Sequence, residues 1–339
     1  MRILVGLSGG LDSTYAAYFL KKQGHEVVGA SVVMHEYTDI SSAEEAANAV
    51  GIPFVVINAE ESFKDRVISR FIDDYLNGRT PNPCIECNPH IKFGVLCEYA
   101  KNNGFDKVTT GHYADIREEN GRYFVKADFK NGKDQSYVLW KLSQEELSML
   151  YLPLASMDKE QIRKEAHELG FRAAESKESQ DICFIPDGDY AAFIKKETGL
   201  TFSEGNFIDS DGKIIGKHKG IVHYTIGQRK GLGAFGKPMF VKEIHPKDNT
   251  ITLVESGNEY MKETVIGELN FMKLEERANG QISAFCKVRY SAMPVPCTVS
   301  FDNGLAYVTF EKDTRAITPG QSAVFYDKND VLFGGIILK

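Results

Sequence analysis

A glycine-rich segment with two serines is the first group of residues in this chain whose types and spacing suit a chemical task. It reads Ser8-Gly-Gly-Leu-Asp-Ser13 and lies between an apolar, β-branched run and a segment with helical periodicity. Glycines allow successive backbone amides to face one anion, and serine hydroxyls and a helix N-terminus add further donors. The lysine of a Walker-type loop is absent. The segment therefore predicts a phosphate-binding loop of another kind.

The cysteines are the second such group. Cys84 and Cys87 form a C-x-x-C pair in the proline-rich segment 79–93, and polar residues flank Cys183. We expect a helix to begin near Pro89, so that Cys87 precedes its N-terminus, where amide dipoles favour the reactive thiolate. The remaining cysteines lie in apolar, periodic contexts typical of buried small side chains, and these are Cys97, Cys286 and Cys297.

Alternating strand and helix patterns must position both groups in the first half of the chain. Short β-branched runs, apolar on both faces, predict parallel strands at residues 3–7, 27–33, 54–57 and 107–110. Helical periodicity predicts helices at residues 13–23, 41–50, 63–77 and 90–103. This succession predicts an α/β domain with an open, Rossmann-like parallel sheet, which binds ligands at the carboxyl ends of its strands.

The pattern changes near residue 200. From there the segments are short and alternating, with turn signals at residues 211–212, 247–249 and 302–304. We expect three domains: an α/β domain at residues 1–200, a small β-rich domain at 201–264, and a β-barrel-like domain at 265–339.

Composition indicates an ordinary globular protein. The chain has 339 residues, of which 42% are hydrophobic and 26% are charged. No apolar run approaches the roughly 18 residues of a membrane span. The first strand begins at once, so we expect no signal peptide ahead of it, and six cysteines in a chain this long do not indicate a disulfide scaffold. We therefore expect a cytoplasmic location and no membrane partner.

Charge is distributed unevenly along the chain. The formal net charge is −7, yet residues 213–247 hold eight basic residues against the single acidic Glu243, which gives this basic stretch a net charge of +7. Such asymmetry indicates a polyanionic partner, although charge alone fits a solvated β surface equally well.

The glycine-rich segment resembles the pyrophosphate-binding signature of the ATP pyrophosphatase (PP-loop) superfamily, whose members hold ATP and transfer AMP to an oxygen. Further segments resemble the tRNA 2-thiouridylase family, essentially end to end, at residues 79–93, 110–113, 133–137, 176–185, 223–233, 288–290 and 318–322. The resemblance implies ATP-dependent 2-thiolation of the wobble uridine of tRNA. In this reaction the C2 oxygen is adenylated, and a persulfide on Cys183 supplies sulfur.

The resemblance also implies residue roles. Cys87 is the nucleophile, and a Cys87–Cys183 disulfide forms as an alternate state. The loop Asn82-Pro83-Cys84 faces the target uracil. Residues that hold ATP are Gly6, Leu7, Ser8, Gly9, Gly10, Leu11, Asp12, Ser13, Val32 and Gly111. Residues that contact tRNA are His112, Lys133, Asp134, Gln135, Arg289, Tyr290 and Gln321.

Cofactors and partners follow from the same resemblance. Asp12 would orient Mg²⁺ or phosphate, since a metal ion removes the conflict between a carboxylate and phosphates. The central β-rich domain would bind tRNA, and the implied substrates are tRNAs for Lys, Glu and Gln. A cysteine desulfurase or a sulfur-relay protein would supply sulfur.

Two departures from the family leave questions open. Many members carry aspartate where this chain has Cys84, so a catalytic carboxylate is not available there. The segment between the second strand and the helix at 41–50 is short, so Met34 is an alternative to Val32 as the adenine contact.

Three other interpretations remain. An iron–sulfur enzyme could bind a cluster through Cys84, Cys87 and Cys183, although four-cysteine spacing is absent. A PP-loop ligase or synthase that adenylates a small metabolite would need no reactive cysteine, and a non-enzymatic RNA-binding module would leave the loop at 8–13 unused. Zinc is not expected, because His90, His112 and the C-x-x-C pair are irregularly spaced.

Overall fold

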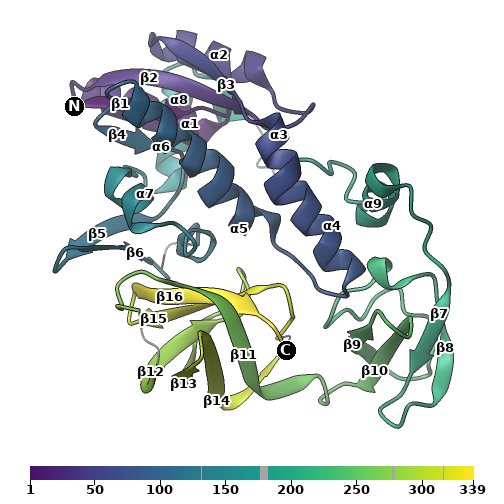
Figure 1. Cartoon of the computed structure of the whole chain (residues 1–339). Helices are drawn as coiled ribbons and strands as arrows, with labels where there is room; N and C mark the ends of the chain where they lie inside the picture. Colours follow the sequence, from purple (N-terminus) through teal and green to yellow (C-terminus); the bar gives the residue numbers. More distant parts are fainter. Residues whose placement is uncertain (131, 176–181, 277–278, 316) are drawn as a thin grey trace.

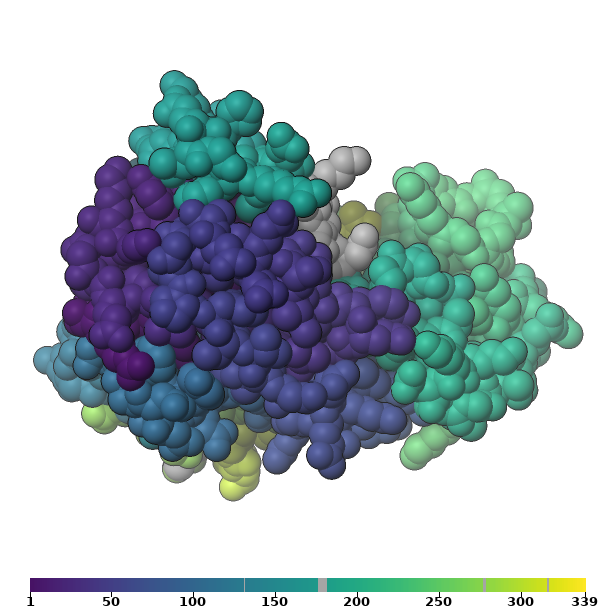
Figure 2. All heavy atoms as spheres, turned by 90° about the horizontal axis from the view of Figure 1, so that it is seen from above, coloured from purple at the N-terminus to yellow at the C-terminus, as the bar shows by residue number. Residues whose placement is uncertain are grey.

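The computed structural model describes residues 1–130, 132–175, 182–276, 279–315 and 317–339. An α/β domain lies above a β-barrel and a smaller mixed sheet in Figure 1. Seen from above, the mixed-sheet domain projects beyond one side of the α/β domain (Figure 2). The segment 176–181 of one family-like motif lies outside the described residues. Within the described ranges, no helix is both long and apolar enough to cross a membrane.

The predicted parallel sheet is confirmed. Its strands are β1 (Arg2–Gly6), β2 (Glu26–Val33), β3 (Phe54–Asn58) and β4 (Lys107–Thr109), in the order β3-β2-β1-β4. All neighbouring pairs are parallel. The strands end within one residue of the predicted positions because their β-branched, apolar runs are bounded by polar residues and glycines.

Helices α1 (Leu11–Lys22) and α2 (Ile40–Val50) also lie where periodicity predicted them. The predicted helix at 63–77 is a continuous segment made of α3 (Glu60–Phe63), a π-helical turn (Lys64–Ile68) and α4 (Ser69–Leu76). Figure 1 shows α4 leading from the sheet toward the β domains. At its end, Gly78 lies so close to the mixed-sheet domain that a Cβ there would be 2.9 Å from Ile244 Cγ2.

The helix expected to begin near Pro89 begins earlier. It is a helical rod (residues 83–102) made of α5 (Pro83–Cys87), the π-helical turn η2 (Asn88–Lys92) and α6 (Phe93–Asn102). Pro89 therefore lies inside the helix, where its missing N–H is accommodated by the wider π turn. This turn brings the Pro89 carbonyl oxygen 2.2 Å from where a Cβ on residue 94 would be, so only glycine fits there.

Several elements were not predicted from the sequence. Helices α7 (Gln144–Met149), α8 (Lys159–Glu168) and α9 (Tyr190–Thr198) follow the sheet strands. The hairpin of β5 (Asp115–Glu119) and β6 (Arg122–Lys126) leaves the α/β domain and pairs with the barrel through Lys126 and Asp330.

The small β domain is a mixed four-stranded sheet. Its strands are β7 (Gly205–Ile208), β8 (Ile214–His218), β9 (Met239–His245) and β10 (Thr250–Glu255), in the order β8-β7-β10-β9. The turn predicted at 211–212 joins β7 to β8, and the turn predicted at 247–249 joins β9 to β10. A core around Phe207, Tyr224 and Val241 stabilises it.

The last domain is a closed six-stranded barrel. Its strands are β11 (Tyr260–Phe271), β12 (Gly280–Lys287), β13 (Val295–Asp302), β14 (Leu305–Arg315), β15 (Ser322–Asp327) and β16 (Asp330–Ile337). The barrel closes because β11 pairs with both β14 and β16. The turn predicted at 302–304 joins β13 to β14. β11 spans the position at which we expected the domain boundary, between residues 264 and 265.

Trp140 joins the α/β domain to the barrel. Its indole is fully buried and donates a 2.9 Å hydrogen bond to Ser322 Oγ of β15, and Asn270 of β11 donates to its carbonyl oxygen. The largest hydrophobic cluster contains Trp140 and Ile85 together with barrel residues such as Val324. The two domains therefore share one core.

This shared core predicts the effect of Gly334→Ala. A Cβ on Gly334 would lie 2.5 Å from Trp140 Cδ2, and the hydrogen-bonded indole cannot move aside. We expect the free energy of unfolding to fall by about 1–3 kcal/mol in urea denaturation. In Gly132→Ala, the matched control, the new methyl group meets nothing within 4 Å. Equal destabilisation of both variants would contradict the proposed packing constraint.

Candidate active site

The loop at residues 8–13 forms a cradle at the carboxyl end of β1. Gly9 has a φ of +75°, and a Cβ there would lie 2.5 Å from Ser42 Cβ, so only glycine fits. Gly10 is the N-cap of α1 and, as a glycine, supplies no side-chain cap to the first amides of the helix. The hydroxyl groups of Ser8 and Ser13 lie 3.2 Å apart. The first amides of a helix without a side-chain cap form an anion-binding site, so this geometry fits a phosphate.

Asp12 in this loop is held by two residues that sequence reasoning did not single out. Tyr113 donates a hydrogen bond of 2.7 Å to Oδ1, and Lys159 Nζ lies 2.9 Å from Oδ2. Lys159 begins α8, 147 residues along the chain, so no local pattern identifies it as part of the loop. It brings a cation to a loop that has no Walker-type lysine.

The other predicted ATP-binding residues divide into two groups. Gly111 follows β4, and a Cβ there would lie 2.7 Å from the Ser13 amide nitrogen, so it closes the cradle from the neighbouring strand. By contrast, the side chains of Leu7, Leu11 and Val32 are buried in the cores on either side of the sheet. These buried side chains leave only backbone atoms of the three residues to bind a nucleotide. Gly6 lies at the end of β1, against Leu96.

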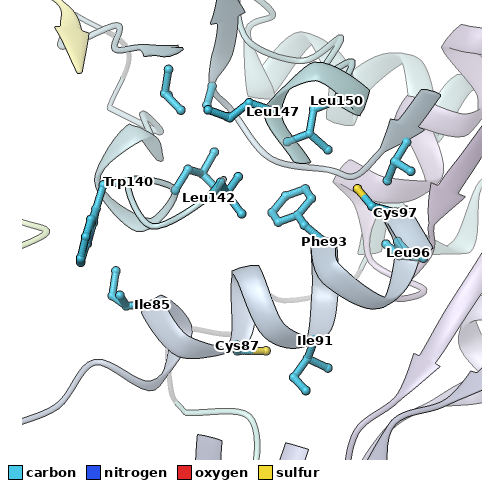
Figure 3. Close-up of a cluster of buried hydrophobic side chains, with 14 of the residues drawn as sticks. Ile85, Cys87, Ile91, Phe93, Leu96, Cys97, Trp140, Leu142, Leu147 and Leu150 are labelled. Carbon is cyan, nitrogen blue, oxygen red and sulfur yellow. The ribbon is translucent and has the colours of Figure 1, made fainter. Parts of the chain in front are cut away.

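Cys87 lies beside the sheet edge, in the helical rod. Its side chain is only 6% exposed, and its Sγ is 3.8 Å from the sulfur of Met34, which follows β2. Figure 3 shows Cys87 on the rod between Ile85 and Ile91. Burial raises the pKa of the Cys87 thiol to about 12. The prediction that an adjacent helix N-terminus favours its thiolate is therefore wrong, because the helix begins at Pro83 and burial dominates.

The rod begins instead beside Cys84. Asn82 is the N-cap, and its side-chain oxygen accepts a 3.1 Å hydrogen bond from the Cys84 amide. Cys84 and Cys183 are both exposed, whereas the other four cysteines are buried, as predicted for three of them. All six are free thiols in this structure.

Lys92 connects the three cysteines electrostatically. Burial alone would lower the pKa of its ammonium, but the charges of Cys87, Cys84 and Cys183 outweigh that effect and raise this pKa. In return, Lys92 opposes the burial that raises the pKa of the Cys183 thiol. Sequence reasoning missed Lys92. This residue ends the π turn that follows Cys87, and the sequence did not predict that turn.

His112 borders the same group of side chains. Its ring centroid lies 5.3 Å from that of Phe93, and its Nδ1 is 2.7 Å from Thr110 Oγ1. Burial, with a smaller contribution from Lys92, lowers the pKa of His112 to about 3. The imidazole is therefore neutral at pH 7 and can act only as a hydrogen-bonding group there.

A buried carboxylate fixes the rod beside Cys87. Glu86 lies 2.6 Å from Lys141 Nζ and 3.4 Å from Arg70 Nε. Burial alone would raise the pKa of Glu86, but hydrogen bonds from His90 and Lys141 and the charges of Lys141 and Arg70 lower it to about 2. Glu268 of the barrel contacts both Arg70 and Lys141. The φ of Glu268 itself is +48°.

The barrel also holds the loop that precedes Cys84. Thr80 donates its amide hydrogen to the Pro319 carbonyl at 2.9 Å, and Gln321 donates its side-chain amide to the Thr80 carbonyl at 2.7 Å. Gln321, predicted to contact tRNA, thus supports the loop at residues 79–82.

The other predicted tRNA-contacting residues follow β6 and β12. Gln135 accepts a hydrogen bond from the Tyr113 amide, and Asp134 accepts one from Ser136. Arg289 donates to the Ile226 carbonyl of the small β domain and to Thr318 of the barrel. Tyr290 is 44% exposed, with Lys287 Nζ 5.6 Å from its ring centroid. Lys133 lies between β6 and the turn at 136–138.

The basic stretch is largely accessible to solvent. Seven of its eight basic side chains are exposed and Lys242 is half-buried. Lys237 pairs with Glu255. These side chains lie on the surface of the small β domain, which is beside the α/β domain in Figure 2.

The cysteines of the iron–sulfur interpretation lack a metal-binding arrangement within the part of the chain that the structure describes. Over the described ranges, no three His, Cys, Asp or Glu side chains are arranged to hold a metal ion. Cys84, Cys87 and Cys183 therefore do not fit a preformed cluster site in this structure.

The charge of Lys92 predicts the reactivity of Cys183. In Lys92→Met, the pKa of this thiol should rise further, so less thiolate is present at a given pH. We expect alkylation of Cys183 by iodoacetamide at pH 8 to slow about three- to tenfold, measured by peptide mass analysis. The control is Lys312→Met, at an exposed barrel lysine. An unchanged rate in Lys92→Met would exclude this electrostatic role.

Known protein families resemble this chain domain by domain. Three consecutive segments match families described as "tRNA methyl transferase HUP domain" (residues 1–187), "tRNA methyl transferase PRC-barrel domain" (191–255) and "Aminomethyltransferase beta-barrel domain" (261–337). A solved 4-thiouridine synthetase–RNA complex with bound ATP is 16% identical, with a TM-score of 0.37, and covers 58% of this chain and 50% of its own.

Curated relatives match over the full length. The tRNA-specific 2-thiouridylase MnmA of Clostridioides difficile is 44% identical over 100% of this chain and 98% of its own. The protein of the same name from Acetivibrio thermocellus is 41% identical over 99% of each chain. The chain belongs to the tRNA-specific 2-thiouridylase family.

Proposed function

We propose that this protein is a tRNA-uridine 2-sulfurtransferase, which thiolates the wobble uridine at C2 with ATP and a cysteine persulfide. The observation that carries the proposal is the meeting of two sites at one sheet edge. The phosphate cradle follows β1 and is closed by Gly111 after β4, while Met34 after β2 contacts Cys87. Both sites therefore lie at the carboxyl ends of neighbouring strands, where sheets of this class bind ligands.

The cradle would hold ATP by its phosphates. Backbone amides at the start of α1 and the two serine hydroxyls face the anion, and Lys159 offers a cation. Asp12 would hold Mg²⁺, which would neutralise phosphate charge during transfer of AMP to the C2 oxygen. Once AMP is attached, that oxygen has become a good leaving group. Val32 and Met34 both remain candidates for the adenine contact.

The cysteines would then exchange sulfur. The outer sulfur of a Cys183 persulfide attacks C2, and Cys87 attacks the sulfur that remains bound to Cys183, so that the sulfur–sulfur bond of the persulfide breaks and AMP departs. The products are 2-thiouridine and a Cys87–Cys183 disulfide. Lys92 lies within electrostatic reach of both sulfurs and would stabilise the anionic forms.

The tRNA would be bound by more than one domain. The target uridine must leave its stack to reach the loop Asn82-Pro83-Cys84, as bases do in other enzymes that act on base atoms. We propose that the anticodon loop is oriented by His112, Lys133, Asp134, Gln135, Arg289, Tyr290 and Gln321. The proposed units are a catalytic domain (1–200), a tRNA-binding domain (201–264) and a barrel (265–339).

Supply of sulfur and reductant suggests the cellular setting. We propose that a cysteine desulfurase or a sulfur-relay protein loads Cys183, whose exposed side chain can meet a partner's persulfide. The disulfide requires reduction after each turnover, which the cytosol supports. The substrates would be tRNAs for Lys, Glu and Gln.

A thiolation assay tests this function directly. The protein is incubated with ATP, a persulfide source and unmodified tRNA, and nucleosides are analysed by mass. We expect 2-thiouridine at the wobble position, and at least about a hundredfold loss in Cys183→Ser and Cys87→Ser, as for other nucleophile replacements. Cys97→Ala is the control, because Cys97 is buried in the core of the α/β domain.

The same assay separates the alternatives. Full activity of Cys183→Ser would exclude thiolation and favour a ligase that adenylates a small metabolite. Anaerobic purification followed by iron and sulfide analysis tests the cluster hypothesis. A colourless, fully active enzyme would end it.

The basic stretch predicts how tRNA binding depends on salt. Replacing Lys217, Lys219, Arg229 and Lys230 by serine should weaken tRNA binding at least about tenfold at low salt and flatten its salt dependence, because fewer counterions are released. Serine replacements of the exposed barrel residues Lys262 and Lys312 are the control. Wild-type binding that barely changes with salt would exclude this surface as the tRNA site.

A further inference from the structure

Cys84 is a thiol that the proposed reaction leaves without a task. It is exposed, and it lies three residues before Cys87 in the same helix, α5. Helical geometry places Cα atoms three residues apart at about 5 Å and their side chains on one face. Disulfides join Cα atoms about 4.4–6.8 Å apart, so these two cysteines can pair without unfolding the helix.

Cys183 belongs to the same cluster. The charges of Cys84 and Cys183 both act on the Cys87 thiol, and Cys84 also acts on Cys183. The half-buried side chain of Lys92 interacts with all three. Cys84 and Cys87 are thus neighbours in one helix, and the disulfide of the proposed reaction would bring Cys183 to the same place.

Access to solvent differs between the three sulfurs. Cys87 is only 6% exposed, while Cys84 and Cys183 are both exposed, so an external thiol could attack the Cys87–Cys183 disulfide only at the Cys183 sulfur. Bound tRNA would cover this face further. A thiol already present beside the disulfide needs no diffusion and gains the high effective concentration of an intramolecular reaction.

We propose that Cys84 is the resolving thiol of the catalytic cycle. This inference rests on the proposed function, which generates the Cys87–Cys183 disulfide. The Cys84 thiolate attacks Sγ of Cys87, so that a Cys84–Cys87 bond forms and the Cys87–Cys183 bond breaks. Cys183 leaves with the electron pair, takes up a proton and is ready for another persulfide.

A cytosolic dithiol completes the exchange. One of its sulfurs attacks the exposed Sγ of Cys84 and forms a mixed disulfide, and Cys87 leaves as a thiol. The second sulfur of the reductant then displaces Cys84. The reductant is oxidised to its disulfide, and both cysteines regain their protons.

Disulfide mapping during turnover tests the proposal. Trypsin places Cys84 and Cys87 in one peptide, 80–92, and Cys183 in another, 178–195. Reactions with ATP, persulfide and tRNA are quenched with acid and N-ethylmaleimide. In the wild type we expect peptide 80–92 to lose the mass of H₂ after the crosslink between the two peptides decays. In Cys84→Ser only the crosslink should accumulate.

Kinetics give a second measurement, normalised to each variant's own first turnover. Cys84→Ser should show a burst of 2-thiouridine followed by a phase at least about tenfold slower, which a high dithiol concentration accelerates. Cys97→Ala, the control, should show no burst.

The outcomes separate the two proposals. Absence of the internal disulfide in wild-type peptide 80–92, or a Cys84→Ser variant without a slow phase, would overturn the resolving role. If the wild type forms no 2-thiouridine even in the first turnover, the proposed function itself is wrong.

Discussion

The buried carboxylate of Glu86 is the interaction on which the geometry of the site depends. It adjoins Cys87 in sequence and is compensated by Arg70 and Lys141, while Glu268 of the barrel completes the charge balance. A buried charge that loses a partner costs about 3–5 kcal/mol, so this network fixes the helical rod in one position. The rod in turn places Cys84 and Cys87 between the parallel sheet and the barrel. Catalysis by the α/β domain therefore requires the barrel to be folded against it.

Burial determines the electrostatics of Cys87. An isolated thiolate at Cys87 is unfavourable, and the pKa of about 12 reflects this cost. Among the described side chains that act on Cys87, only that of Lys92 lowers the pKa of its thiol. His112 stays neutral because burial and, to a smaller extent, the charge of Lys92 both lower its pKa. Cys87 is therefore protonated in this structure.

Residues that the family resemblance assigns to tRNA also join the domains. Gln321 holds the loop before Cys84, and Arg289 links the small β domain to the barrel. Contact of tRNA with these side chains would compete with or reinforce those hydrogen bonds. Such contacts would act on the loop before Cys84, because Gln321 bonds to Thr80.

The sequence by itself determined the parallel strands, the glycine-rich loop after the first of them and the burial of Cys97, Cys286 and Cys297, because these depend on local hydrophobic pattern, glycine content and immediate neighbours. It did not determine where the helical rod begins, since proline is equally typical of a helix start and only the π turn accommodates Pro89 inside. The tertiary structure alone brought Lys159 to Asp12 and Glu268 to Lys141. Such pairs lie more than 100 residues apart, and their meeting depends on how whole domains pack rather than on any local pattern.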